Sequence, residues 1–192
     1  MSVTEEKKII AKSALHSFGG TPSVYRCWDD NRNSHVDLVT CKNRPYEGIN
    51  SSATIGLSDF SIGYSAGDVP LRTEIVGAAN SEFEWFPNVL STCAFNVINS
   101  QMECGMGKIH HDVIEMYYPS FEMKHILFVP PFLWEESLKT IDFPDKKVAW
   151  LMAIPISENE YRYAKEKGSE ALEDLFEKKE IDFYDLKRKS VV

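Results

Sequence analysis

The stretch Lys147-Val-Ala-Trp-Leu-Met-Ala-Ile-Pro-Ile156 is the most apolar run in the chain. A short, nearly uncharged run that contains β-branched and aromatic side chains is typical of a strand buried on both faces. Pro155 has no backbone N–H, so we expect strand pairing to stop there on one side. The run therefore predicts the central strand of a sheet.

Helices are predicted on both sides of this strand along the chain. Directly after it, Ser157 and Glu160 form a capping box, which predicts a helix that ends at Gly168, and Ser169 begins a second helix. Residues 86–98 carry an apolar stripe with the helical period of 3.6. A further helix is predicted from Thr4, a capping residue, to Gly19.

Strand signals fill most of the remaining sequence. Alternating residues predict a hairpin with strands at 24–28 and 36–41 and a polar turn at 29–33. Further strands are expected at 52–57, 71–76, 109–118 and 125–129, and residues 130–134 are expected to leave the sheet as a stiff, partly extended loop. Interspersed helices and strands, some of them joined by short turns, predict a single α+β domain over residues 1–192, with a mixed β-sheet and flanking helices.

The net charge of the chain indicates which class of partner it can bind. The 192 residues carry 29 acids against 21 lysines and arginines, for a formal charge of −8. An acidic chain does not suit a phosphate-binding surface, whereas it favours a steered encounter with a basic protein. We therefore expect a protein partner, with no direct contact to nucleic acid. The oligomeric state stays open.

Other sequence features indicate the compartment. No apolar run reaches the roughly 18–20 residues that span a bilayer, and the acids Glu5 and Glu6 do not fit a secretory signal. The four cysteines show no C-x-x-C spacing, which is typical of reduced thiols. These features predict a cytoplasmic protein that does not contact a membrane.

A search for catalytic chemistry finds no motif for phosphate, dinucleotide, zinc or serine-nucleophile sites. Cys104, with Glu103 beside it, lacks the positive neighbours that would activate a thiolate. The densest metal-like group comprises Cys104, His110, His111, Asp112 and Glu115. On a strand these side chains alternate between two faces, so one ion would not easily gather them. The search thus gives no candidate catalytic residue and no metal site, and a metal-dependent enzyme remains the less favoured alternative.

The acidic C-terminal region is a stronger signal. Residues 158–185 contain ten acids against five bases. The region could be a solvated face with i,i+4 ion pairs such as Asp174 with Lys178. It could also be a surface for a cationic partner, because Glu170 and Asp174, like Glu173 and Glu177, place like charges at i,i+4.

A second candidate contact follows Pro130-Pro131. Trp134 is followed by Glu135 and Glu136. An aromatic residue on a rigid loop can anchor an interface. The alternative is that Trp134 packs into the edge of the core.

Short motifs along the chain resemble the suppressor-of-fused domain family. They are Ser52-Ala-Thr-Ile-Gly-Leu-Ser58, Arg72-Thr-Glu-Ile-Val76, Trp150-Leu-Met-Ala-Ile-Pro-Ile-Ser157 and Arg188-Lys-Ser-Val191. Other stretches are similar to a bacterial immunity branch of that family, namely Met1-Ser-Val-Thr4, 14–22, Met116-Tyr-Tyr-Pro119 and 125–135.

The resemblance implies an immunity protein, or antitoxin, that binds and neutralises the C-terminal nuclease domain of a cognate LXG-type toxin. Such a protein has no catalytic residues and no cofactor. The family pattern transfers no binding residue, so the candidate toxin contacts rest on the charge and aromatic patterns above: Trp134, Glu135, Glu136, Glu170, Glu173, Asp174 and Glu177. The alternative function is a peptide-clamping module that binds an extended segment by strand addition, which an exposed, unpaired sheet edge would favour.

Overall fold

The apolar run becomes β9 (Lys147–Ser157), which lies between β5 (Val69–Asn80) and β7 (Met123–Val129) in a computed structural model that describes residues 4–192. β9 is parallel to β5 and antiparallel to β7. Pairing with β5 ends at Met152, whereas pairing with β7 continues past Pro155 to Ser157. The prediction of a central strand whose pairing stops on one side near Pro155 is confirmed.

The other strands extend the sheet in both directions. The order is β1-β2-β3-β5-β9-β7-β6, with β4 paired to β5 and β8 paired to β9. The bounds are β1 (Pro22–Trp28), β2 (His35–Cys41), β3 (Ile49–Ile55), β4 (Tyr64–Ala66), β6 (Ile109–His110) and β8 (Ile141–Asp142). Only the β5–β9 pair is parallel among the paired strands of residues 4–192, so the sheet is mixed, as predicted.

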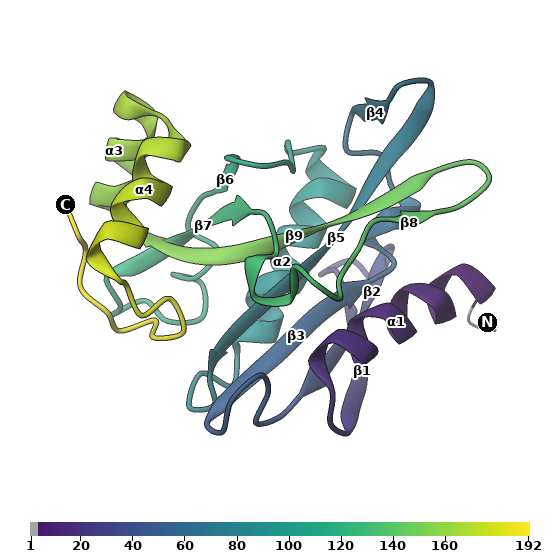
Figure 1. Cartoon of the computed structure of the whole chain (residues 1–192), viewed down its shortest axis with the longest axis horizontal. Helices are drawn as coiled ribbons and strands as arrows, with labels where there is room; N and C mark the ends of the chain where they lie inside the picture. Colours follow the sequence, from purple (N-terminus) through teal and green to yellow (C-terminus); the bar gives the residue numbers. More distant parts are fainter. Residues whose placement is uncertain (1–3) are drawn as a thin grey trace.

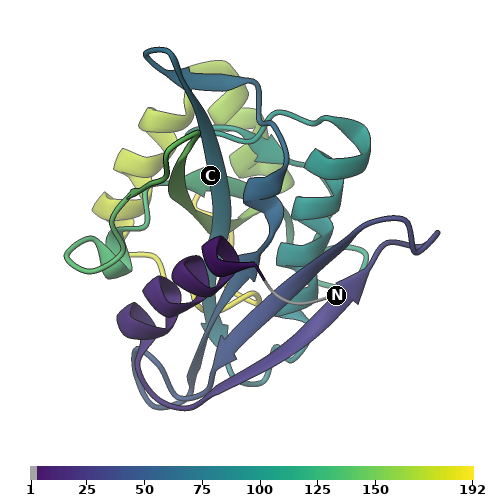
Figure 2. The same cartoon turned by 90° about the vertical axis from the view of Figure 1, so that its right-hand side faces the viewer.

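Two helices cover opposite faces of this sheet. α1 (Glu5–Phe18) buries Ile10, Ala14 and Phe18 in one core, and α2 (Phe86–Ser100) packs in the other. Alternate residues of β9 enter the two cores, for example Met152 with α1 and Leu151 with α2. Figure 2 shows the two helices on either side of the central strands. The predicted α+β architecture with flanking helices is confirmed.

The C-terminal helices form a separate pair at one end of the sheet (Figure 1). α3 (Glu158–Lys167) begins directly at the end of β9, and α4 (Ser169–Lys179) follows after Gly168. Both halves of the predicted capping box are present: the Glu160 amide donates to Ser157 Oγ, and the Ser157 amide donates to the Glu160 carboxylate. The end of β9 therefore fixes the direction of α3.

The strand prediction at 109–118 is wrong. Residues 109–118 form a strand only at Ile109–His110, because Asp112 takes a positive φ of 57° and the chain then coils through turns that bury Val113 and Ile114. The segment 130–134 leaves β7 as predicted, and its second part forms the 3-10 turn η2 (Phe132–Trp134).

Residues 1–3 lie outside the described part of the chain. They include most of the Met1–Thr4 motif and the start of the N-terminal segment that does not fit a secretory signal. In residues 4–192, no helix combines the length and the apolar character needed to cross a membrane. All four cysteines are free thiols, as predicted.

Candidate partner-binding surface

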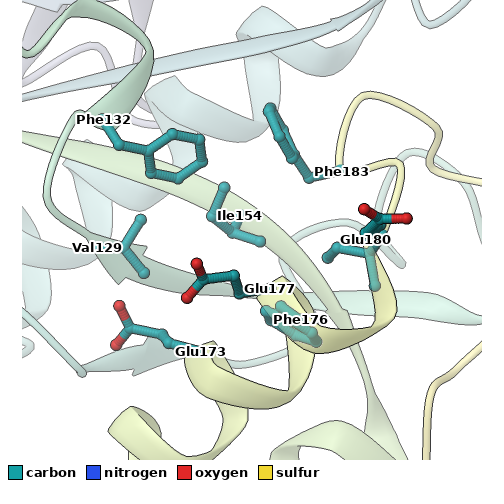
Figure 3. A pocket seen from close by; sticks show the side chains of 9 residues that line it. Val129, Phe132, Ile154, Glu173, Phe176, Glu177, Glu180 and Phe183 are labelled. Atoms are coloured by element: carbon teal, nitrogen blue, oxygen red, sulfur yellow. The ribbon is translucent and has the colours of Figure 1, made fainter.

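An open apolar groove of about 510 Å³ lies beside α4, and we call it the α4 groove. Its lining comes from three separate parts of the chain: Val129, Phe132, Ile154, Glu173, Phe176, Glu177, Glu180, Ile181 and Phe183. Figure 3 shows the carboxylates of Glu173 and Glu177 extending from α4 toward Val129 and Ile154. The rings of Phe132 and Phe183 meet edge to face with centroids 5.2 Å apart. The groove thus combines an apolar interior with an acidic rim.

The helix that supplies this rim is amphipathic. Leu172 and Phe176 are buried against the core, and this packing leaves Glu170 and Asp174 exposed to solvent. Glu173 is half-buried at the groove, and Glu177 is exposed at its edge. Helical periodicity therefore divides the four predicted acids of α4 into two groove residues and two residues outside it.

The acids of α4 are not neutralised within the molecule. Over residues 4–192, the ion pairs include none with Glu170, Glu173, Asp174, Glu177 or Glu180. On the neighbouring helix, by contrast, Glu158 pairs with Arg162 at 2.7 Å. The predicted i,i+4 pair of Asp174 with Lys178 is therefore not formed. α4 therefore presents four acids without an ion-pair partner over residues 4–192, with Lys178 and Lys179 in its last turn as the bases of the helix.

The negative charge of α4 affects the pKa of Glu173. Burial raises the pKa of Glu173 above its ordinary value, and the nearby carboxylates Glu170 and Asp174 raise it further. A cation placed at the groove would lower this pKa, because it would supply the opposite charge that the carboxylate lacks. The arrangement suits a positively charged group.

A buried ion pair holds α4 in position. Arg188 contacts both carboxylate oxygens of Glu160, at 2.6 and 2.8 Å, and also donates to the Pro155 carbonyl. Its guanidinium lies 5.2 Å from the centroid of the Phe176 ring, which lines the groove. The C-terminal segment thereby connects the end of β9, the first turn of α3 and the wall of the groove.

The second predicted contact region is only partly at the surface. Trp134 is 4% exposed and packs on Phe18 with ring centroids 4.8 Å apart, so the interpretation that it packs into the core is confirmed, and its place among the candidate contacts as an accessible anchor is not. The indole fills space between α1 and η2 that a smaller side chain would leave empty. Glu135 and Glu136 are exposed, and they follow Phe132 of the groove by three and four residues.

The candidate metal cluster does not assemble. Over residues 4–192, no group of three or more histidine, cysteine or acidic side chains is placed to hold a metal ion. His110 is fully buried beside Phe128, and burial lowers its pKa to about 4. Burial also raises the pKa of the Cys104 thiol to about 12, so this cysteine stays protonated at neutral pH.

A histidine that the sequence analysis did not single out occupies this region. The buried His125 accepts a hydrogen bond from the Asp112 amide at Nδ1, and its Nε2 lies 3.0 Å from the Glu158 carboxylate. The contacts join the turn after β6 to the start of α3. His125 thus connects Asp112, the residue with a positive φ, to the first residue of α3.

The sheet edge relevant to strand addition is open. Within residues 4–192, β1 is the first strand in the sheet order and pairs with β2 alone. Six of its seven residues are exposed and Cys27 is half-buried, with Val24 61% and Trp28 45% accessible. The structure therefore also offers the feature that a peptide-clamping module needs.

The family model described as Suppressor of fused protein (SUFU) matches residues 32–189. The chain belongs to the suppressor-of-fused family. Its sequence is 53% identical over 192 residues to a protein named Immunity protein YqcF from Bacillus subtilis strain 168, with the whole of both chains covered.

Solved structures of the suppressor-of-fused family share the fold. A SUFU homolog from Neisseria gonorrhoeae FA 1090 superposes with a TM-score of 0.72 at 16% identity, covering 97% of this chain and 96% of that one. A chain of a Sufu–Fu complex gives a TM-score of 0.64 at 11% identity, covering 96% and 91%. Drosophila Suppressor of Fused gives 0.58 at 13% identity, with 82% of this chain and 43% of that chain covered.

The aromatic lining of the groove in this suppressor-of-fused protein escaped the sequence analysis. Phe132 lies in the loop noted for its tryptophan, and Phe183 lies after α4 in the acidic C-terminal region. Phe176 is on the buried side of α4. No local signal connects Phe132 with α4, because the sequence has no phenylalanine between Phe143 and Phe176.

Proposed function

We propose that this chain is an immunity protein that protects the producing cell by binding and neutralising a cognate toxin. The observation that supports this most directly is the 53% identity, over the full length of both chains, to a protein named Immunity protein YqcF. Such a role requires direct contact and no covalent step. It acts in the cytoplasm, where it meets the toxin before export.

The target we propose is the C-terminal nuclease domain of an LXG-type toxin. A nuclease presents lysines and arginines to phosphate, and an acidic protein complements that surface. This chain carries a formal charge of −8, and its α4 acids have no cationic partner over residues 4–192. The proposed contact surface comprises Glu170, Glu173, Asp174 and Glu177 with Glu135 and Glu136.

Neutralisation demands tight binding. An immunity protein that works at cellular concentrations needs a Kd of about 1 nM, or about −12 kcal/mol. Exposed acids set the encounter rate, whereas desolvated contacts supply most of that energy. The apolar α4 groove, and not Trp134, is the feature that can supply such contacts, because Trp134 is buried.

The test is protection of cells. The toxin domain encoded beside the gene for this chain is expressed alone, with this chain, or with an immunity protein of an unrelated toxin. We expect growth only with this chain, and a stable complex when the two purified proteins are mixed. No protection and no complex would overturn the proposal, as would turnover of a small molecule by the purified chain.

Strand addition at β1 is the second candidate, and the exposed edge strand Pro22–Trp28 favours it. Hydrogen exchange of the complex separates the two modes of binding. Docking at α4 slows amide exchange within residues 169–183, whereas an added strand slows exchange within β1. Protection confined to β1 would favour the peptide clamp.

A further inference from the structure

The α4 groove is shaped for a long side chain. Phe176, Ile154 and Val129 provide apolar surface, and Phe132 and Phe183 provide aromatic rings. A volume of about 510 Å³ falls in the range of about 300–1,000 Å³ that ligand sites occupy, so the groove holds a whole side chain with its backbone at the rim. The occupant must bury an extended apolar stem.

The rim specifies the charge at the end of that stem. Glu173 and Glu177 are one helical turn apart, and both line the groove. Like charges at i,i+4 disfavour each other in the free protein. A single cation between them would be attracted by both carboxylates. Glu180, also on the rim, adds a third negative charge.

Of the two basic side chains, arginine matches the groove better. Its guanidinium is more weakly hydrated than an ammonium group, stacks on aromatic rings and binds carboxylates through two parallel hydrogen bonds. Phe132 and Phe183 supply the rings, and Glu173 and Glu177 supply the carboxylates. Arginine is also enriched among the residues that dominate interface energies.

We propose that the α4 groove is the socket for one arginine of the toxin, with the side-chain stem on Phe176 and Ile154 and the guanidinium at Glu173 and Glu177. This inference rests on the proposed immunity function and adds the chemistry of its anchor. The arginine becomes desolvated when it enters, so its contacts slow dissociation. The acids outside the groove act at long range on association.

A matched pair of variants on one helix tests this division. Glu173→Gln/Glu177→Gln removes the two groove charges, and Glu170→Gln/Asp174→Asn removes two charges from α4 outside the groove lining. Removing one side of a buried charged contact costs about 2–5 kcal/mol, so we expect the first variant to dissociate from the purified toxin domain about 30- to 4,000-fold faster. The second variant should associate more slowly and dissociate at the native rate. Equal effects of the two variants on dissociation would overturn the inference.

Arginines of the toxin domain identify the occupant. Each is replaced by glutamine and by lysine, and binding to the native chain and to Glu173→Gln/Glu177→Gln is measured. One Arg→Gln change should weaken binding to the native chain about as much as the groove variant does, and add little when combined with it. The proposal would be contradicted if lysine replaced that arginine without loss of affinity. It would also be contradicted if no toxin arginine showed energetic coupling to Glu173 and Glu177.

Failure of the socket is distinguishable from failure of the immunity function. If the native chain binds the toxin and protects cells while Glu173→Gln/Glu177→Gln dissociates at the native rate, only the socket is wrong. If the native chain neither binds nor protects, the proposed function is wrong. Thermal unfolding of both variants confirms that the comparison is made on folded protein.

Discussion

At the scale of single residues, the Arg188–Glu160 pair connects stability to the candidate surface. Both side chains are buried, at 6% and 0% exposure, and Glu160 also caps α3. A buried ion pair adds little over a well-packed apolar pair, but removing one partner leaves an uncompensated charge in the interior. The pair therefore fixes where α4 sits more than it raises overall stability.

Arg188→Met should lower the free energy of unfolding by about 3–5 kcal/mol, because the Glu160 carboxylate would stay buried without its partner. Urea denaturation measures the change. Adding Glu160→Gln should recover part of the loss, since glutamine keeps the capping contact without the charge. Lys189→Met, at an exposed neighbour, is the control and should change stability by less than about 0.5 kcal/mol. Equal losses for the two single variants would contradict the prediction.

The Glu173 carboxylate should strengthen toxin binding and lower the stability of the free folded protein. Because its pKa is raised in the folded state, the folded protein takes up this proton more readily than the unfolded chain, so stability decreases as pH rises through the folded pKa. Glu173→Gln should therefore raise the melting temperature at pH 7, and the gain should shrink toward pH 4. The same variant should weaken toxin binding.

Melting curves at pH 7 and pH 4 check this prediction. Glu136→Gln, at an exposed position on another element, serves as the matched control and should leave both melting temperatures nearly unchanged. A Glu173→Gln variant that is less stable than the native chain at pH 7 would show that the carboxylate is stabilised in the free protein.

At the scale of secondary-structure elements, much of the molecule is readable from local sequence. β9 was predicted because a short apolar run with β-branched and aromatic residues and no interior charge favours a buried strand, and α3 was predicted because Ser157 and Glu160 have capping spacing. The strand prediction at 109–118 was wrong because its apolar residues are buried by turns, which begin at the positive φ of Asp112. Periodicity cannot distinguish these two ways of burying Val113 and Ile114.

One close contact between elements determines how α2 sits on β5. A Cβ atom at Gly77 would lie 2.9 Å from Cε1 of Phe86 and 3.3 Å from Leu90. Gly77→Ala should therefore overpack this contact and cost about 1–3 kcal/mol in the free energy of unfolding. Phe86→Leu shortens the side chain that meets the new methyl group, so the double variant should lose less than the sum of the single losses. Additive losses in denaturant titrations would show that α2 shifts freely.

At the scale of the whole molecule, the α4 groove could not be derived from local sequence. Its walls come from the end of β7, the middle of β9, α4 and the segment after α4, and only the tertiary fold brings these together. The acids of α4 were predictable from their charge pattern, whereas their division into groove and outside residues depends on how the helix packs. Trp134 shows that a local pattern can also mislead. An aromatic residue next to acids indicates a surface contact only if its side chain points outward, and that of Trp134 points into the core.

The net charge of −8 leads to a prediction about the rate of association. Attraction between an acidic chain and a basic toxin domain accelerates encounter, and salt screens it, with a Debye length of about 10 Å at 0.1 M. The association rate constant should therefore fall steeply as sodium chloride is raised, while the dissociation rate constant changes little. Stopped-flow or surface-binding kinetics over a series of salt concentrations measures both constants.

Charge variants then locate the source of this attraction on the molecule. Glu135→Gln/Glu136→Gln should flatten the salt dependence of association if the segment after η2 faces the toxin, and Glu170→Gln/Asp174→Asn should do so if the outer face of α4 does. If the surface that faces the toxin includes both regions, each of the two variants should weaken the salt dependence of association. An association rate insensitive to salt in the native chain would mean that charge does not guide the encounter. Recognition would then have to begin at an uncharged feature, of which the exposed β1 edge is the clearest.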